Sequence, residues 1–265
     1  MPKPIPPEIL TLLRNPYHLE ALALDAQADP PALVGVESGQ TFPVISGIPS
    51  FLESTASSRH NRYYRWFYDR FAFGYDTVVR LGSRLRIGTE TTVRAEAIAT
   101  LPVKSGDFVL ESAVGTGSNI PVLPPDINFC GVDISFNMLR RAQRKLPRWE
   151  RSATFFHADA EYLPFQDNAF DLVFQMGGLQ FMGDPASALA ELLRVAKPGT
   201  TIIVLDEAAS AARTLQRIPD FKAHTWDKVS ALTALPEIVP VNASDPQANI
   251  LPSGEFYQLQ FKKRD

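Results

Sequence analysis

Between residues 107 and 207 the chain alternates short apolar segments with amphipathic ones, and this rhythm is what most constrains its fold. The segments DFVLES, INFCGVDIS, ATFFHADA, FDLVFQMG and TTIIVLDEA are nearly continuous apolar runs, typical of parallel strands that are buried on both faces. FNMLRRAQRKL and PASALAELLRVAK carry apolar residues at helical spacing. The pattern predicts a doubly wound α/β sheet, with one more helix opening at 115–123, another near 226–235, and a final strand in EFYQLQFKKR.

Composition divides the chain into three parts. Residues 1–53 carry short apolar bursts broken by Pro and Gly, which predicts a small β-rich module. Residues 54–106 hold a linker and an aromatic-rich stretch with helical spacing, expected to pack on the core or to close over a site as a lid. Residues 107–265 form the predicted α/β core.

Charge and cysteine content exclude several classes of function. The net charge of −3 gives no general attraction to nucleic acid. Cys130 is the only cysteine, which excludes an internal disulfide and a cysteine cluster, and we expect no metal. Without a signal peptide or an apolar run of about 18 residues, the chain is expected to be cytoplasmic and to have no integral membrane segment. A homodimer is compatible with these features.

The stretch VLESAVGTGSNIP, at 109–121, ends the first core strand in a Gly-Thr-Gly turn, where an open α/β sheet binds ligands. A Walker loop would need a lysine after the second glycine, and Ser118 and Asn119 follow instead. A dinucleotide fingerprint would need a small third residue, and Ile120 weakens that interpretation. S-adenosylmethionine (SAM) carries no phosphate and needs only the close backbone approach that glycine permits.

Carboxylates at the next two strand ends favour SAM. Asp133 follows Gly117 by 16 residues and can accept hydrogen bonds from two ribose hydroxyls, as it also would from NAD. Asp159 ends the third strand and can accept from an adenine amino group. Each alone is equally well a helix cap or a turn former. His157, at the start of the same motif, is interpreted as a strand histidine with a backbone partner rather than a base.

Four segments, in order and at the usual spacing, resemble the motifs of class I SAM-dependent methyltransferases: VLESAVGTGSN, GVDISFNMLRRAQRK, HADAEYLPFQDNAFDLVF and ALAELLRVAKPGTTIIVLD. The stretch YDRFAFGYD, at 68–76, resembles the pattern that precedes this core in the ubiquinone/menaquinone C-methyltransferase-like group. The resemblance covers about residues 61–210. It implies a Rossmann-like, mostly parallel sheet with an antiparallel last strand, and SAM as cofactor.

By that resemblance, Glu111, Gly115 and Gly117 would line the methionine end of the cofactor. Ala113 stands where the family has its first motif glycine, a departure that adds one methyl group. The other implied cofactor-binding residues, in chain order, are Tyr68, Tyr75, Asp133, Ile134, Met138, Asp159, Ala160 and Gln175. Of these, Asp133 would take the ribose hydroxyls with Ile134 and Met138 beside the adenine, Asp159 and Ala160 would read the adenine edge, Gln175 would face the sulfonium, and Tyr68 and Tyr75 would close the lid.

The first 53 residues resemble the small zinc-ribbon module that precedes some bacterial methyltransferases, whose ending F-P-x-x-x-G-I-P is intact from Phe42 to Pro49. The four ligand positions match Asn15, His18, Gly35 and Ser38. A structural zinc site needs four Cys or His ligands, so this degenerate ribbon is expected to be metal-free. Its fold should rest on docking and on its own apolar residues: Leu33, Val36, Phe42, Ile45 and Ile48.

Two classes of function follow. The first is a SAM-dependent methyltransferase that acts on a small aromatic or lipophilic metabolite at carbon or oxygen. The second is a SAM-binding protein that transfers no methyl group, either a regulatory subunit or a non-methylating enzyme. No acid–base pair stands out, and the sequence names no catalytic residue.

Overall fold

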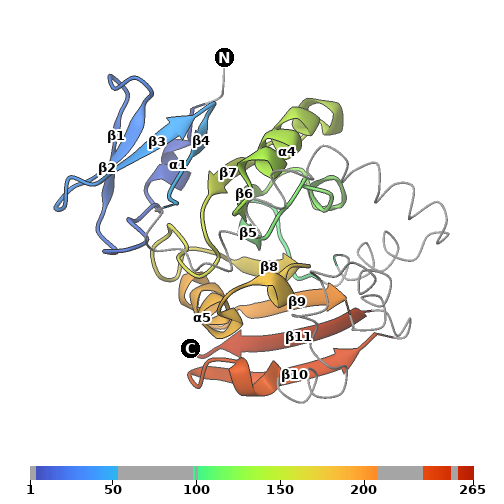
Figure 1. The fold of residues 1–265 in the computed structure, drawn as a ribbon. Helices are drawn as coiled ribbons and strands as arrows, with labels where there is room; N and C mark the ends of the chain where they lie inside the picture. The colour runs from blue at the N-terminus through green and yellow to red at the C-terminus, as the bar shows by residue number, and fades with distance from the viewer. Residues whose placement is uncertain (1–3, 53–97, 99–100, 208–234, 252–255) are drawn as a thin grey trace, which may run out of the picture.

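The computed structural model describes residues 4–52, 98, 101–207, 235–251 and 256–265 (Figure 1). The described elements form a sheet of four strands and a sheet of seven. The seven strands are β5 (Phe108–Ser112), β6 (Asn128–Asp133), β7 (Thr154–His157), β8 (Leu172–Met176), β9 (Thr201–Glu207), β10 (Ala243–Ile250) and β11 (Phe256–Lys263).

The larger sheet has the strand order β10-β11-β9-β8-β5-β6-β7. Strands β5 to β9 run parallel, and β11 pairs antiparallel with both β9 and β10. The predicted mostly parallel sheet with an antiparallel last strand is therefore confirmed. The chain runs outward from β5 to β7 and returns to β8 on the other side of β5, so the strand order reverses between β5 and β8.

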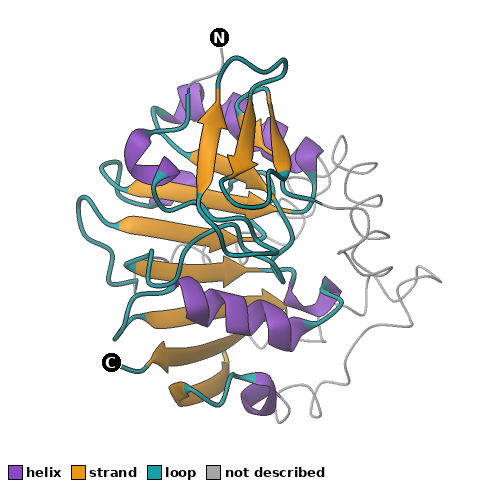
Figure 2. Ribbon diagram, turned by 90° about the vertical axis from the view of Figure 1, so that its left-hand side faces the viewer, coloured by secondary structure: helices purple, strands orange, loops and turns teal. Residues whose placement is uncertain are grey.

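Both faces of this sheet are covered, which explains the continuous apolar strands. On one face Val109 belongs to the same apolar cluster as Leu139 of α4 (Phe136–Trp149). On the other, Leu110 clusters with Leu192 of α5 (Pro185–Val195), and Figure 2 shows this helix lying across the sheet. Each helix begins where a side chain caps it, Ser135 for α4 and Asp184 for α5.

One expectation for the core was wrong, and one strand was missed. Instead of a helix opening at 115–123 there is only the 3₁₀ turn η1 (Ile120–Val122), because prolines follow closely in NIPVLPPD. Strand β10 was not predicted. Its sequence is polar, Asp245 has a φ of +52°, and the register with β11 shifts between Ser244 and Gln247. An edge strand tolerates such a bulge and the adjacent proline.

The smaller sheet belongs to residues 4–52, which we call the N-terminal module. It contains α1 (Pro7–Leu10) and the antiparallel strands β1 (Leu22–Asp25), β2 (Ala32–Gly35), β3 (Thr41–Ile45) and β4 (Ile48–Pro49). As expected, the side chains of Leu33, Phe42 and Ile48 are buried. Val36 and Ile45 were wrongly expected there and are 66% and 42% exposed, because β2 ends before Val36 and Ile45 has the opposite parity to Phe42.

The N-terminal module packs against the edge of the large sheet near β7 (Figure 1). Phe42 and Phe51 belong to the same apolar cluster as Phe156 and Phe165 of the core, so the two cores are continuous. Polar contacts accompany this packing: Leu13 forms a bridge with Phe165, and the Arg14 guanidinium donates to the Gln166 side-chain oxygen over 2.6 Å.

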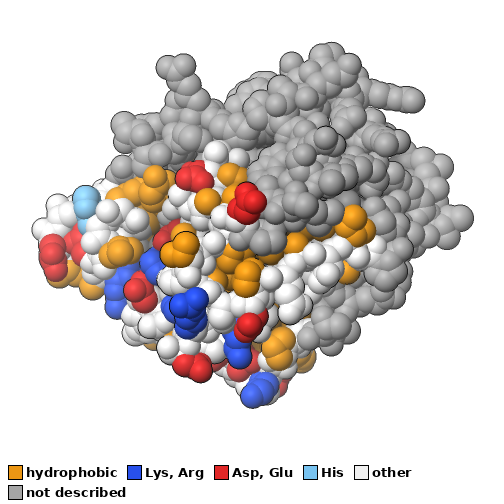
Figure 3. Space-filling view, turned by 90° about the horizontal axis from the view of Figure 1, so that it is seen from below, with side chains coloured by type: hydrophobic (Ala, Val, Ile, Leu, Met, Phe, Trp, Pro, Cys, Tyr) orange, Lys and Arg blue, Asp and Glu red, His pale blue; other side chains and the backbone are white. Residues whose placement is uncertain are grey.

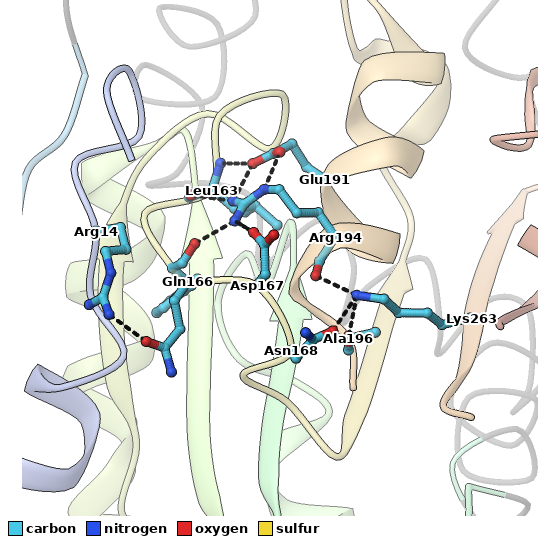
Figure 4. A network of polar contacts seen from close by, with 10 residues as sticks. Arg14, Leu163, Gln166, Asp167, Asn168, Glu191, Arg194, Ala196 and Lys263 are labelled. Atoms are coloured by element: carbon cyan, nitrogen blue, oxygen red, sulfur yellow. Dashed lines mark hydrogen bonds and ion pairs between the residues drawn. The ribbon is translucent and has the colours of Figure 1, made fainter. Parts of the chain in front are cut away.

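Arg194 of α5 holds the loop that follows β7 (Figure 4). Its guanidinium lies 2.6 Å from Glu191 and 2.9 Å from Asp167, and it donates to the carbonyl oxygens of Leu163 and Phe165 over 3.0 and 2.6 Å. Burial works against its positive charge, but the hydrogen bonds and charges of Glu191 and Asp167 prevail and raise its pKa. The loop from Asp159 to Asp167 is therefore fastened to the sheet's helical layer.

Among the described residues on the face seen in Figure 3, acidic and basic side chains are interspersed, and neither sign forms a continuous patch. This agrees with the small net charge of −3.

Candidate functional site

The carboxyl ends of β5, β6, β7 and β8 meet at one edge of the sheet, and most of the predicted site residues lie there. Glu111 is the last residue but one of β5, Asp133 ends β6, and Gln175 is near the end of β8. Asp159 lies two residues after β7. The sheet therefore brings together residues that are up to 64 positions apart in the sequence. Tyr68 and Tyr75 lie outside the described residues.

The loop after β5 is left-handed at three positions, with φ of +54° at Ala113, +55° at Gly115 and +74° at Gly117. The two glycines serve different purposes. A Cβ on Gly117 would lie 2.9 Å from Ile120 and 3.2 Å from Ala142, so this glycine is needed for packing against α4. A Cβ on Gly115 would meet no atom of the described residues within 4 Å, so these residues leave open space beside this glycine.

The methyl group of Ala113 fits because a third glycine, Gly178, lies opposite it. A Cβ on Gly178, just after β8, would lie 3.2 Å from the Ala113 Cβ, and Gly178 itself has a φ of +96°. The loops after β5 and β8 therefore approach closely because Gly178 has no side chain. The departure from glycine at this position narrows the space between the two loops.

The Asp133 carboxylate connects the loop after β5 with the loop after β6. Its Oδ2 accepts a hydrogen bond from Gly115 N over 2.7 Å, and its Oδ1 accepts from Ser135 N over 2.8 Å. A carboxylate oxygen has room for more than one donor, so these contacts leave Asp133 able to accept from a ligand hydroxyl. Beside it, Ile134 is half-buried and Met138 is buried at 3% exposure.

Asp159 and Ala160 lie in the next loop, with exposures of 3% and 9%. The Asp159 Oδ1 accepts from Glu161 N over 3.1 Å, and its carbonyl oxygen accepts from Tyr162 N over 3.0 Å. Asp159 thus does form a turn, the bland role open to it from sequence alone. That turn also places its carboxylate and the Ala160 backbone at the strand edge.

Glu111 has a partner that sequence reasoning missed. Its Oε1 accepts from Asn119 Nδ2 over 2.6 Å, and both residues are buried. Asn119 stands eight positions away, beyond the glycine turn, so neither strand nor helix periodicity could have indicated the pairing. The contact fixes one carboxylate oxygen of Glu111 and closes the loop onto β5.

Two further buried polar side chains occupy the point where strand order reverses. Ser112 of β5 and Gln175 of β8 are neighbours in register, and both are 0% exposed. They interrupt an apolar row across the sheet that includes Val132 and Val204. Within the described part of the chain, neither the Ser112 hydroxyl nor the Gln175 amide has a hydrogen-bond partner. Buried polar groups without partners are rare, and a ligand at the switch point is one reason to retain them.

His157 ends β7 and, as expected, has a backbone partner. Its Nε2 lies 3.1 Å from the carbonyl oxygen of Ile134, and its Nδ1 lies 2.8 Å from the Ser50 hydroxyl. Both ring nitrogens are therefore engaged, which does not suit a general base. The thiol of Cys130 is also unsuited to chemistry, because complete burial raises its pKa.

The positions matched to zinc ligands surround a carboxylate. The Glu20 side chain accepts hydrogen bonds from Asn15 Nδ2 over 2.9 Å, from Ser38 N over 2.8 Å and from the Ser38 hydroxyl. A Cβ on Gly35 would overlap Glu20 Oε1, so a larger residue there would displace this carboxylate. Three of the four matched positions thus converge on Glu20, while His18 is exposed.

No group of three or more His, Cys, Asp or Glu side chains in the described ranges is arranged to hold a metal ion. Likewise, none of the helices that the structure describes is long and apolar enough to cross a membrane.

Comparisons with known proteins place this geometry in context. A family model described as a methyltransferase domain matches residues 110–204. A demethylmenaquinone methyltransferase of Lactiplantibacillus plantarum is 32% identical over 145 residues, which are 52% of this chain and 60% of that enzyme. A phosphatidylethanolamine N-methyltransferase of Cereibacter sphaeroides is 27% identical over 223 residues, which are 80% of this chain and 100% of that enzyme.

A solved structure from Thermotoga maritima, described as a SAM-dependent methyltransferase and possible histamine N-methyltransferase, has the same fold. The TM-score is 0.56 at 19% sequence identity, and the match covers 76% of this chain and 99% of that one. The chain spans about 60% of the length of the first curated relatives that it matches.

Proposed function

We propose, on the premise that this chain carries a methyltransferase domain with the Rossmann-like fold of class I, that it transfers a methyl group from SAM to a small lipophilic acceptor. One observation carries the proposal most directly. The space that the described residues leave open at Gly115 lies next to the Asp133 carboxylate, which accepts a hydrogen bond from Gly115 N over 2.7 Å. A ligand that enters there meets bare backbone and an acceptor for ribose hydroxyls, which is what SAM requires.

The residues along the strand ends divide the cofactor between them in this proposal. Glu111 and the backbone of Gly115 bind the methionine end, and Asp133 accepts from the ribose hydroxyls. Asp159 accepts from the adenine amino group while Ala160 N donates to a ring nitrogen. Gln175, at the switch point, faces the sulfonium region. The positions of these side chains at one sheet edge support the assignment.

Bound SAM would supply a methyl group on a positively charged sulfur, which is already a good leaving group. The protein therefore has to hold the acceptor in line and keep water out, and such positioning contributes about 7–11 kcal/mol to lowering a barrier. Ser112 and Gln175 offer neutral polar groups for this alignment. Because His157 is engaged at both nitrogens, the proposal assigns no general base.

We infer that the acceptor is a flat aromatic or otherwise lipophilic molecule that is methylated at carbon or oxygen. The likeness to a demethylmenaquinone methyltransferase supports a quinone-like ring. The likeness to a phosphatidylethanolamine N-methyltransferase supports a lipophilic acceptor but a different accepting atom. We prefer a quinone-like ring as acceptor, because the relative that acts on one is 32% identical, against 27% for the phosphatidylethanolamine enzyme.

Calorimetry with SAM, its product S-adenosylhomocysteine (SAH) and NAD tests the cofactor, and labelled methyl transfer to a demethylated naphthoquinol or to phosphatidylethanolamine tests the acceptor. We expect binding of SAM and SAH, no binding of NAD, and label on the quinol. NAD binding without SAM binding would overturn the proposal. SAM binding with no label on any acceptor in a cell extract would favour a protein that binds SAM without methylating.

A further inference from the structure

We infer that the N-terminal module positions the cofactor site through a continuous chain of hydrogen bonds that begins at Ser50 and ends at Asp133 and Gly115. This inference rests on the proposed function, since it assigns Ser50 and His157 as positioning residues for the proposed ribose-binding carboxylate. It gives the module a role in binding as well as in packing.

The first hydrogen bonds of this series connect the N-terminal module to the large sheet. Ser50 follows β4 and forms a parallel bridge with His157 at the end of β7. The Ser50 hydroxyl lies 2.8 Å from His157 Nδ1, and His157 Nε2 lies 3.1 Å from the carbonyl oxygen of Ile134. A carbonyl oxygen only accepts, so Nε2 carries a proton, and in the neutral form of the ring Nδ1 accepts from the Ser50 hydroxyl. The two hydrogen bonds therefore favour the same tautomer of the imidazole.

The second half runs through one peptide group. His157 donates to the carbonyl oxygen of the Ile134–Ser135 peptide, and the N–H of that peptide donates to Asp133 Oδ1 over 2.8 Å. The peptide is planar, so fixing its oxygen also fixes the direction of its N–H. The other carboxylate oxygen of Asp133 accepts from Gly115 N over 2.7 Å. Ser50 is thus linked through His157 and one peptide plane to the carboxylate and the glycine loop.

The module end of this chain is firmly held. Phe51, which follows Ser50, is 0% exposed, and its N–H donates to the carbonyl oxygen of His157 over 2.8 Å. The Tyr17 hydroxyl donates to the Phe51 carbonyl oxygen over 2.7 Å, and Ser50 N donates to the Pro43 carbonyl oxygen over 2.9 Å. The Ser50 hydroxyl is therefore a fixed point from which the imidazole is oriented.

The test compares SAH binding by the full-length wild type and three variants in calorimetry. Ser50→Ala removes the hydroxyl, and Ser50→Thr retains it. Ser46→Ala is the matched control, because Ser46 also bonds across to the core, through Arg140 of α4, but has no part in the chain. We expect Ser50→Ala to raise the Kd for SAH about threefold to tenfold, and Ser46→Ala and Ser50→Thr to stay within twofold of the wild type.

A cycle with Asp133→Ala shows whether the effect travels through the carboxylate. In the Asp133→Ala background, Ser50→Ala should change the Kd by less than twofold, because the group that it positions is gone. An unchanged Kd in Ser50→Ala, equal losses in Ser50→Ala and Ser46→Ala, a failure of Ser50→Thr to restore binding, or a full effect without Asp133 would each overturn the inference. A wild type that binds no SAH would instead overturn the proposed function, and this inference with it.

Discussion

At the scale of single residues, the candidate site contains two kinds of polar side chain, those with a hydrogen-bond partner and those without one among the described residues. Asp133 is already held by two backbone N–H groups, at 2.7 and 2.8 Å, before any ligand is considered. Ser112 and Gln175 are buried among apolar neighbours, and within the described part of the chain they have no hydrogen-bond partner. The hydrogen bonds to Asp133 order the loops around it. The unpartnered groups of Ser112 and Gln175 lower the free energy of unfolding, and a ligand that hydrogen-bonded to them would remove this penalty.

Asp133→Ala should weaken SAH binding by about 1.5–3 kcal/mol, the usual loss for hydrogen bonds to a charged acceptor. The fold should survive, because the side chain lies at a strand end and is only half-buried. Calorimetry measures the Kd, and the midpoint of thermal unfolding reports the fold. An unchanged Kd would reduce Asp133 to a residue that only orders the glycine loop.

Gln175→Leu should separate stability from binding. Leucine has a similar size and no polar group, so burying it should raise the free energy of unfolding by about 1–3 kcal/mol, the penalty of an unpartnered buried amide. SAH binding should weaken at the same time, because the proposed contact with the sulfonium region is lost. Ser112→Ala is the matched test in the adjacent strand. A stabilised variant with unaltered SAH affinity would show that Gln175 only fills the core.

At the scale of elements, the N-terminal module is organised around an anion. The Glu20 carboxylate accepts from side chains and backbone of the segments before β1 and after β2, and so joins the two ends of a hairpin. The hydrogen bond from the Ser38 hydroxyl, together with those from Ser38 N, Glu37 N and Asn15, lowers the pKa of Glu20 from 4.5 to about 2, although burial opposes the shift.

A carboxyl whose pKa is lower in the folded state stabilises the fold above its unfolded pKa and loses this contribution as the pH falls. For Glu20 the contribution should be complete above about pH 4.5 and should vanish toward pH 2. The difference in free energy of unfolding between wild type and Glu20→Gln should therefore be constant from pH 7 to 5 and shrink below pH 4.5. Glu37→Gln is the matched control, because Glu37 is exposed and contacts Glu20 through its backbone N–H, which the substitution keeps. A wild type minus Glu20→Gln difference that did not change with pH would contradict this role.

At the scale of the whole molecule, the module and the large sheet share one apolar core. Phe42 and Phe51 cluster with Phe156 and Phe165, whose rings meet edge to face at 5.0 Å. Hydrogen bonds to His157 and Gln166 accompany this packing. About 50 residues bury too little surface to be comfortably stable alone, so the module depends on the large sheet for part of its stability.

Purified protein should contain no stoichiometric zinc, and deletion of residues 1–53 should lower the thermal midpoint and weaken SAH binding. The deletion exposes Phe156 and Phe165 and removes Ser50 from the hydrogen-bond chain. Elemental analysis and calorimetry measure both effects. One zinc ion per chain would show that the ligand matching is wrong, and a deletion without effect on stability or binding would make the module a passive appendage.

Much of the fold was decided locally. Parallel strands buried on both faces have to be continuously apolar, so β5 to β9 could be predicted from their residues, and so could the position of Asp133 at the end of a strand. The polar β10 could not, because an edge strand is held by pairing with β11 and needs no apolar pattern of its own. A helix was wrongly expected where η1 lies, because the effect of the prolines after Ile120 was not taken into account.

The sequence by itself determined the five parallel strands, the helices α4 and α5 between them, and the residue types at the strand ends, because periodicity and local steric preferences act over a few neighbouring residues. Only the tertiary structure decided which side chains meet. Asn119 on Glu111, Glu20 at the centre of the positions matched to zinc ligands, and Ser50 on His157, 107 residues away, are contacts of this kind. A hydrogen bond depends on distances and angles between groups that folding brings together, and no period along the chain records those distances.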